Sequence, residues 1–180
     1  FLDGFVQKGL REKLEKMLAS RSARVTHEEA ITILKKAGRQ WEFPPEYGAD
    51  IAKEHEKYLT EEYFGSPVFI TDWPKDIKCF YMKQNPDGKT VAAVDYLVPG
   101  AGEMMGGSQR EEDCDKLVAE MKRRGMNIEE LYWYVNLRRY GTCKHSGFGM
   151  GFERMLMYLT GIDNIRDVLP FPRTPGNCNF

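Results

Sequence analysis

A run of alternating glycines followed by an acid and an arginine is the segment of this sequence best suited to bind a ligand. Gly147, Gly149 and Gly151 recur at every second position, so in an extended strand they would share one face. A face without side chains lets a flat ligand or a second backbone lie close. Glu153 and Arg154 follow at the expected strand–helix junction, where a guanidinium can cover an aromatic base or pair with phosphate. Close helix–sheet packing and a salt bridge at the helix start are the structural alternatives.

Two carboxylates and an arginine form a second group, on a predicted hairpin. Near the centre of a sheet, Asp95 and Glu103 would supply the hard oxygen ligands that Mg²⁺ accepts, with phosphate completing the shell. Arg110 has the opposite parity to Glu103 in a regular strand, so a shared face would require a bulge at Gly106–Gly107. Two ordinary solvent-facing charges on an edge strand are the alternative.

Basic residues upstream of the glycines form a third group. Arg138 and Arg139 are adjacent, and Lys122–Arg124 is a second small cluster. Both clusters could meet an anionic ligand, although a solvated surface is the simpler interpretation. His145 could contact a substrate or act as a general base, but a lone histidine is more often structural.

Composition restricts the class of protein. The 180 residues include 42% hydrophobic and 29% charged residues, which is typical of a globular domain. The chain has 26 Lys and Arg against 27 Asp and Glu. This balance excludes a protein that binds nucleic acid through an overall basic surface, but it does not exclude a local basic patch. No apolar run approaches the length of a membrane-spanning helix, and no leader opens the chain. Four widely spaced cysteines favour free thiols in a reducing, cytoplasmic setting: Cys79, Cys114, Cys143 and Cys178.

The order of predicted elements is typical of an α+β fold, with an antiparallel sheet flanked by helices. A helix from Leu10 comes first, then a helix capped by Thr26 with Glu29 completing a capping box. Strands joined by short turns follow a third helix, and two helices precede the glycine strand. The remaining predicted ranges are a helix over 51–64, strands over 68–71, 77–82, 90–98 and 102–109, and helices over 111–124 and from 127.

Gly147 to Arg154 resembles motif 3 of the class II aminoacyl-tRNA synthetases. Together with Gly102–Glu103, Gly106–Arg110 and Asn164–Val168, it is similar to the aspartate/asparagine/lysine subgroup. Aspartyl members usually carry a hydrophobic residue and His after the matching Arg, whereas Glu111 and Glu112 stand here. The finer resemblance is to the asparagine-specific members, and three stretches carry it: 74–78 with 80–82, 107–111 and 170–175.

The resemblance implies a two-step reaction. Asparagine and ATP would form asparaginyl-adenylate, and the asparaginyl group would pass to the acceptor end of tRNA(Asn). The resemblance also implies a role for each matched residue. Arg154 would contact the γ-phosphate and the adenine face, and Glu103, joined by Asp95, would hold Mg²⁺. The remaining assignments are Gly151, Phe152 and Glu153 to ATP, and Arg110, Arg139 and Gly147 to the amino acid, with Arg139 meeting its side-chain oxygen.

Other parts of the family pattern are missing. Motif 1, motif 2 and the anticodon-binding barrel have no counterpart, so residues 1–180 are expected to be the C-terminal portion of an incomplete catalytic domain. We expect the isolated chain to be inactive and the full-length enzyme to be a homodimer. An aspartyl-tRNA synthetase, a synthetase-like paralogue that amidates aspartate, and a non-catalytic interaction module are the alternatives.

Overall fold

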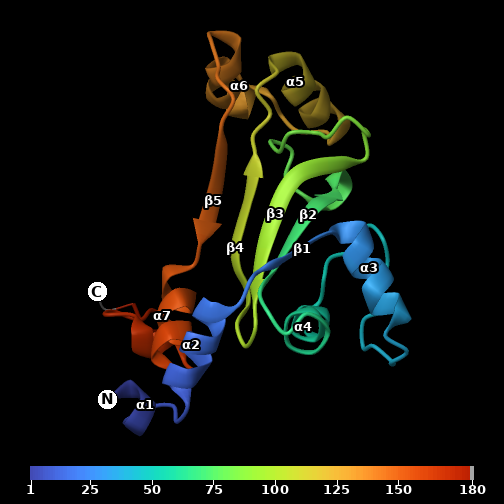
Figure 1. The fold of residues 1–180 in the computed structure, drawn as a ribbon. Coiled ribbons are helices and arrows are strands. Elements are labelled where there is room, and N and C mark those ends of the chain that lie inside the picture. The colour runs from blue at the N-terminus through green and yellow to red at the C-terminus, as the bar shows by residue number, and fades with distance from the viewer. Residues whose placement is uncertain (179–180) are drawn as a thin grey trace.

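A five-stranded sheet with the strand order β1-β2-β3-β4-β5 organises the chain (Figure 1). The computed structural model describes residues 1–178. The β2–β3, β3–β4 and β4–β5 pairs are antiparallel, which agrees with the predicted α+β class. β1 was not predicted, and it runs parallel to β2. The strands are β1 (Ala23–Thr26), β2 (Val68–Pro74), β3 (Thr90–Val98), β4 (Gly102–Gln109) and β5 (Ser146–Met150).

Helices cover one side of the sheet and both of its ends. In Figure 1, α3 and α4 lie beside β1 and β2, α5 and α6 lie beyond one end, and α2 and α7 lie at the other. No helix within residues 1–178 is long and apolar enough to cross a membrane. The helices are α1 (Leu2–Phe5), α2 (Leu10–Ala19), α3 (His27–Lys36), α4 (Lys53–Lys57), which continues into the π-helical segment η1 (Tyr58–Tyr63), α5 (Cys114–Arg123), α6 (Tyr132–Arg139) and α7 (Phe152–Thr160).

Helix α3 begins at the predicted capping box. The Thr26 hydroxyl accepts the Glu29 N–H at 3.2 Å, and the Glu29 carboxylate accepts the Thr26 N–H at 2.8 Å. The apolar face of the helix then packs on β1 and β2. The fully buried members of this core include Ala30, Leu34, Val68 and Ile70. A smaller core of Leu117, Met121 and Val135 joins α5 to α6.

The strand predicted over 77–82 is wrong. Lys75–Ile77 forms a 3₁₀ turn, and only an isolated bridge joins Met82 to Arg110. The aromatic residues that suggested a strand, Phe80 and Tyr81, pack instead against the α5–α6 core. Their burial, rather than a strand ladder, holds this segment.

Several predicted boundaries also shift: the strand predicted over 68–71 extends to Pro74, and the helix predicted from 127 begins at Tyr132 after a 3₁₀ turn. The helix predicted from Glu111 begins at Cys114, because the Asp113 carboxylate accepts the N–H groups of Asp115 and Lys116 and so caps it there. Gly151 lies beyond β5, at the N-cap position of α7.

Candidate functional site

Three strands place the predicted site residues on one face of the sheet. Residues paired across neighbouring strands share a face, and the pairs join Asp95 to Gly106 and Gly106 to Gly149. Ser108 pairs in the same way with Gly147. A Cβ atom on Gly149 would meet nothing within 4 Å. Gly147 and Gly149 therefore lie on one open face, as their spacing predicted, whereas Gly151 lies outside the strand.

A bulge in β4 brings Glu103 onto this face. The β3–β4 register shifts between Tyr96 and Leu97, and Leu97 then pairs with Glu103. Met104 is the extra residue, and its side chain is buried. The bulge predicted at Gly106–Gly107 is therefore required, but it lies at Met104. It turns Glu103 to the side that carries Asp95 and Arg110.

The two carboxylates converge above Gly106. A Cβ atom on that glycine would lie 2.9 Å from Glu103 Oε1 and 3.2 Å from Asp95 Oδ1. The second Asp95 oxygen accepts from Lys78 Nζ at 2.6 Å, and that ammonium lies 3.7 Å from the centroid of the Trp73 ring. Burial raises the pKa of Asp95, and the Lys78 ammonium opposes that rise.

Arg154 and Glu56 approach the same end of the site from two helices. The Arg154 guanidinium, in the first turn of α7, donates to the backbone carbonyl of Glu103. Glu56 on α4 faces Glu103 across a small polar cavity. Burial, helped by the Glu103 charge, raises the pKa of Glu56 to about 7. Phe152 stands beside Arg154 and is 67% exposed, while Glu153 is partly buried.

The donor set suits Mg²⁺ bound together with phosphate. Across residues 1–178, three or more acidic, cysteine or histidine side chains nowhere gather as a metal cage. However, one oxygen of Glu103 and one of Asp95 face the same space above Gly106. Mg²⁺ is usually held by one or two carboxylates, with water and substrate phosphates as its other ligands. The residues present therefore fit this ion.

Arg110 occupies the opposite end of β4, roughly 20 Å from Glu103 by strand length. Its guanidinium donates to Ser108 Oγ at 2.9 Å and stacks 4.7 Å from the centroid of the Tyr81 ring. A Cβ atom on Gly147 would lie 3.2 Å from Arg110 Nη2. Glycine at position 147 thus lets the guanidinium lie against the floor.

The two adjacent arginines of α6 have different environments. Arg138 is buried, and its guanidinium donates to the Glu111 carbonyl at 3.0 Å and the Tyr134 hydroxyl at 2.9 Å. Arg139 is exposed, and the described residues provide its side chain with no hydrogen bond or ion pair. Its predicted contact with the amino acid is compatible with this free guanidinium. His145 lies 3.5 Å from Arg138 and binds the Cys143 carbonyl, which favours the structural interpretation.

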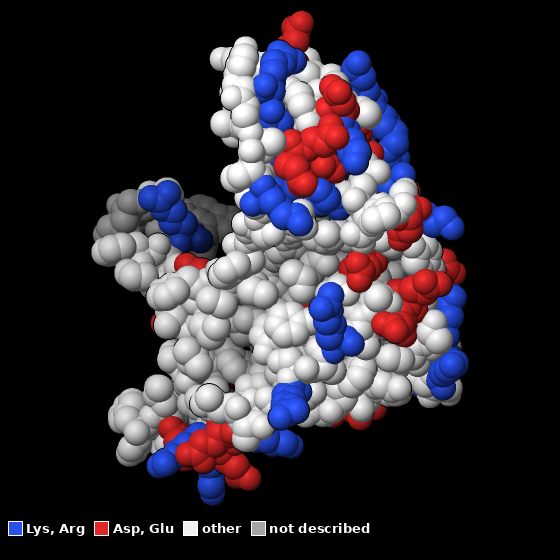
Figure 2. Space-filling model, turned by 45° about the horizontal axis from the view of Figure 1, so that its top comes forward, with Lys and Arg blue, Asp and Glu red and all other residues white. Residues whose placement is uncertain are grey.

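The basic cluster at 122–124 is largely neutralised. Glu120 accepts hydrogen bonds from Arg123 and Arg124, and Arg123 also pairs with Asp76 at 2.8 Å. Figure 2 shows acidic and basic side chains interleaved over the end of the molecule that carries α5 and α6. This arrangement supports a solvated surface rather than an anion site.

Three residues of the site were missed from the sequence. Lys78 pairs with Asp95, Tyr81 supports Arg110, and Glu56 lies beside Glu103. Lys78 and Tyr81 fall inside stretches that carry the family resemblance, which was the only signal available for them. Glu56 sits in a charged helix that reads as solvent-facing.

Comparison with known proteins decides the family. The family described as class II tRNA synthetases (D, K and N) matches residues 3–175. The chain belongs to this family.

Curated members of this synthetase family are similar over the whole chain. The asparagine–tRNA ligases of Clostridium tetani and Acholeplasma laidlawii are 55% and 59% identical over 180 residues. The chain spans 39% of the length of each. The asparaginyl-tRNA synthetase of Pyrococcus horikoshii, solved with asparaginyl-adenylate, is 38% identical with a TM-score of 0.80. That match covers 98% of this chain and 42% of the other. The predicted family is confirmed, while residue roles and domain boundaries stay predictions.

Proposed function

We propose that this chain is the C-terminal portion of the catalytic domain of an asparagine–tRNA ligase. The full-length enzyme would activate asparagine with ATP and transfer it to tRNA(Asn). The observation that carries the proposal is the placement of Arg110, Glu103 and Arg154 along one glycine-floored face. An elongated ligand with an amino-acid end and a phosphate end fits such a face. The high identity to asparagine–tRNA ligases supports asparagine over aspartate.

Activation joins two anions, the asparagine carboxylate and the α-phosphate of ATP. Their repulsion must be neutralised, so the work of the site is positioning and electrostatic stabilisation. Arg154 would bind the γ-phosphate and cover the adenine, with Gly151, Phe152 and Glu153 beside the nucleotide. Mg²⁺, held by Glu103 and Asp95, would supply further positive charge to the phosphates.

The amino-acid end would be formed by Arg110, Gly147 and Arg139. Arg110 is held rigidly by Ser108 and Tyr81, so it can fix the asparagine carboxylate without reorganising. Arg139 would meet the side-chain oxygen of asparagine. A guanidinium alone would prefer the charge of aspartate, so rejection of aspartate requires a further acidic or amide group.

The whole enzyme would act on tRNA(Asn) as a homodimer in the cytoplasm. Residues 1–180 contain counterparts of motif 3 but none of motifs 1 and 2. We therefore expect the chain on its own to be inactive in aminoacylation. Measurable aminoacylation by the isolated chain would contradict this expectation.

Pyrophosphate exchange by the full-length enzyme tests the proposal. Exchange should depend on asparagine, should not occur with aspartate, and should be lost in Arg154→Ala. Exchange with aspartate would instead identify an aspartyl enzyme. Conversion of aspartate to asparagine without tRNA charging would identify an amidating paralogue, and no ATP binding by calorimetry would favour a non-catalytic module.

A further inference from the structure

The turn between β3 and β4 holds the phosphate end of the site in place. Glu103 is the second residue of β4, directly after this turn, and its carbonyl also accepts from Arg154. Gly100 and Gly102 adopt φ values of +78° and +71°, a region that favours glycine. Any movement of the turn would therefore move the Glu103 carboxylate.

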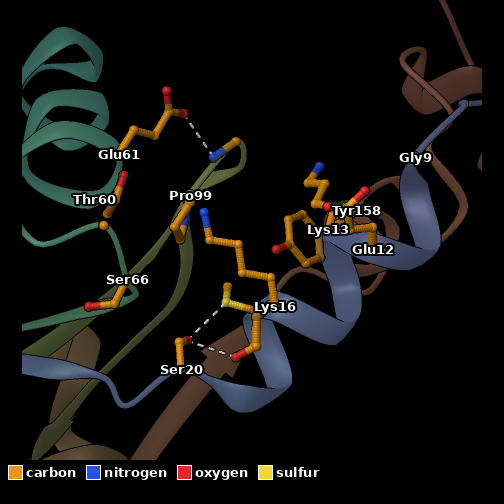
Figure 3. Close-up of a pocket in the computed structure, with 13 residues that line it drawn as sticks. Gly9, Glu12, Lys13, Lys16, Ser20, Thr60, Glu61, Ser66, Pro99 and Tyr158 are labelled. Carbon is orange, nitrogen blue, oxygen red and sulfur yellow. Dashed lines mark hydrogen bonds between the residues drawn. The ribbon is translucent and has the colours of Figure 1, made fainter.

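Two carboxylates from the α4–η1 helix bind this turn. Glu61 accepts the backbone N–H of Gly100 at 3.0 Å, as Figure 3 shows. Glu56 lies so close to Gly102 that a Cβ atom there would collide with its Oε2, and its carboxylate is stabilised by the Glu103 N–H. The turn is thus contacted at Gly100 and at Gly102 from one helix.

The π-helical segment η1 explains how one helix can supply both groups. In an α-helix, residues four apart lie one above the other, whereas π-helical bonds link residues five apart. The Phe64 N–H bonds to the Leu59 carbonyl at 3.0 Å, which is such a bond. Glu61 lies within η1 and Glu56 lies in α4 before it, so the widened turn changes the angle between their side chains from that of a regular α-helix. π-Helical turns are frequent at functional sites.

On its other side the turn is approached by Lys13 of α2, because a Cβ atom on Gly100 would lie 3.4 Å from Lys13 Nζ. Pro99 and Gly100 line a cavity of about 470 Å³ together with residues of α2 and Tyr158 (Figure 3). Lys13 borders this cavity, with its ammonium 4.5 Å from the centroid of the Tyr158 ring. The turn has its own hydrogen bond, from the Ala101 N–H to the Val98 carbonyl at 3.0 Å. The carboxylates of the helix add a restraint from outside the turn.

We infer that Glu56 and Glu61 form a turn clamp that positions Glu103 for ATP and Mg²⁺. The inference rests on the proposed function and adds two positioning residues to it. Neither carboxylate needs to touch substrate. Because Arg110 lies at the far end of β4, loss of the clamp weakens the nucleotide end and spares the amino-acid end.

The test uses the full-length enzyme and reads the two ends of the site separately. Glu61→Ala should raise the KM for ATP by about tenfold, the factor that corresponds to one hydrogen bond of ordinary net strength. The KM for asparagine should change by less than about twofold, which is the size of the deviation from additivity found between distant, independent sites. Glu61→Gln keeps an acceptor oxygen and should retain most of the ATP affinity. Hydrogen exchange at the Gly100 amide should accelerate in Glu61→Ala.

Glu62→Ala is the matched control, because Glu62 pairs with Arg39 on the surface at 2.9 Å and faces away from the turn clamp. It should leave both KM values and the Gly100 exchange unchanged. Glu56→Ala provides a second variant and should raise the KM for ATP more than the KM for asparagine, whereas Glu56→Gln keeps an acceptor oxygen and should retain most of the ATP affinity.

Unchanged ATP KM and unchanged Gly100 exchange in Glu61→Ala would overturn the inference. An equal rise in both KM values would also overturn it, since that result indicates a general loss of structure. If the wild-type enzyme shows no asparagine-dependent pyrophosphate exchange, the proposed function fails instead. The rate of hydrogen exchange at the Gly100 amide in Glu61→Ala then still decides whether the turn clamp exists.

Discussion

Arg138 and Arg139 are adjacent in sequence, yet their substitution should affect different properties. Arg138→Ala should lower stability, whereas Arg139→Ala should raise the KM for asparagine. Arg138→Ala removes the donor for the Glu111 carbonyl, whose residue is 3% exposed. An unsatisfied buried acceptor costs about 1–3 kcal/mol. The guanidinium also lies 4.0 Å from the centroid of the Tyr134 ring, a contact worth roughly 0.5–1 kcal/mol. We therefore expect Arg138→Ala to lower the free energy of unfolding by about 3 kcal/mol.

Arg139→Ala is the matched control for stability. The side chain is exposed, so the free energy of unfolding should change by less than about 0.5 kcal/mol. In the full-length enzyme, however, the same substitution should raise the KM for asparagine. Arg138→Ala should leave that KM nearly unchanged at temperatures where the variant stays folded.

Urea denaturation followed by tryptophan fluorescence measures the first effect, with Trp133 on α6 as a local reporter. In a melt, a 3 kcal/mol loss corresponds to roughly 6–12 °C for a chain of this size. Equal destabilisation by both substitutions would refute the assignment of Arg138 as the buried arginine. A normal asparagine KM in Arg139→Ala would refute the proposed role of Arg139.

Three further predictions concern stability. Gly107→Ala should lower the free energy of unfolding by about 1–3 kcal/mol, because a Cβ atom would lie 2.8 Å from the backbone of β5. Gly149→Ala should leave it nearly unchanged, because a Cβ atom there would meet nothing within 4 Å. Urea denaturation of the two variants measures the difference. The Arg123 hydrogen bond lowers the pKa of Glu120 to about 2, below its unfolded value. The resulting stability is present above about pH 4.5 and is lost toward pH 2, and Glu120→Gln should remove this pH dependence in melts at several pH values. Burial lowers the pKa of His27 in the folded state. As the pH decreases below about 6.5, the unfolded state therefore binds a proton that the folded state does not, and the free energy of unfolding should decrease. This decrease should be less steep in His27→Gln.

Local signals in the sequence predicted much of the fold. The bounds of β3 and β4 agree with prediction, because β-branched residues and the Pro99–Gly100 turn are encoded within a few positions. The capping box at Thr26 is equally local. By contrast, β1 is four residues long and is a strand only through its parallel pairing with β2, 45 positions later. Such a pairing leaves no local pattern.

The sequence predicted which residues belong to the candidate site, but it did not predict how all of them are arranged. The glycine spacing was sufficient to place Gly147 and Gly149 on one face. The face of Glu103 depends on the bulge at Met104, which is specified by burial of that side chain against other elements. Glu56 carries no sequence signal of its own, because an acid on a charged helix resembles a solvated residue until the turn beside it is seen.

The two ends of β4 are held by different means, and this difference determines how the site should tolerate change. Arg110 is fixed by its own side-chain contacts with Ser108 and Tyr81. Glu103 is fixed through its backbone, by the bulge and by the carboxylates that bind the preceding turn. Substitutions at the sheet surface near Arg110 should therefore act only locally. Substitutions on the α4–η1 helix, which carries none of the residues proposed to bind asparagine or ATP, should instead alter the phosphate end of the site.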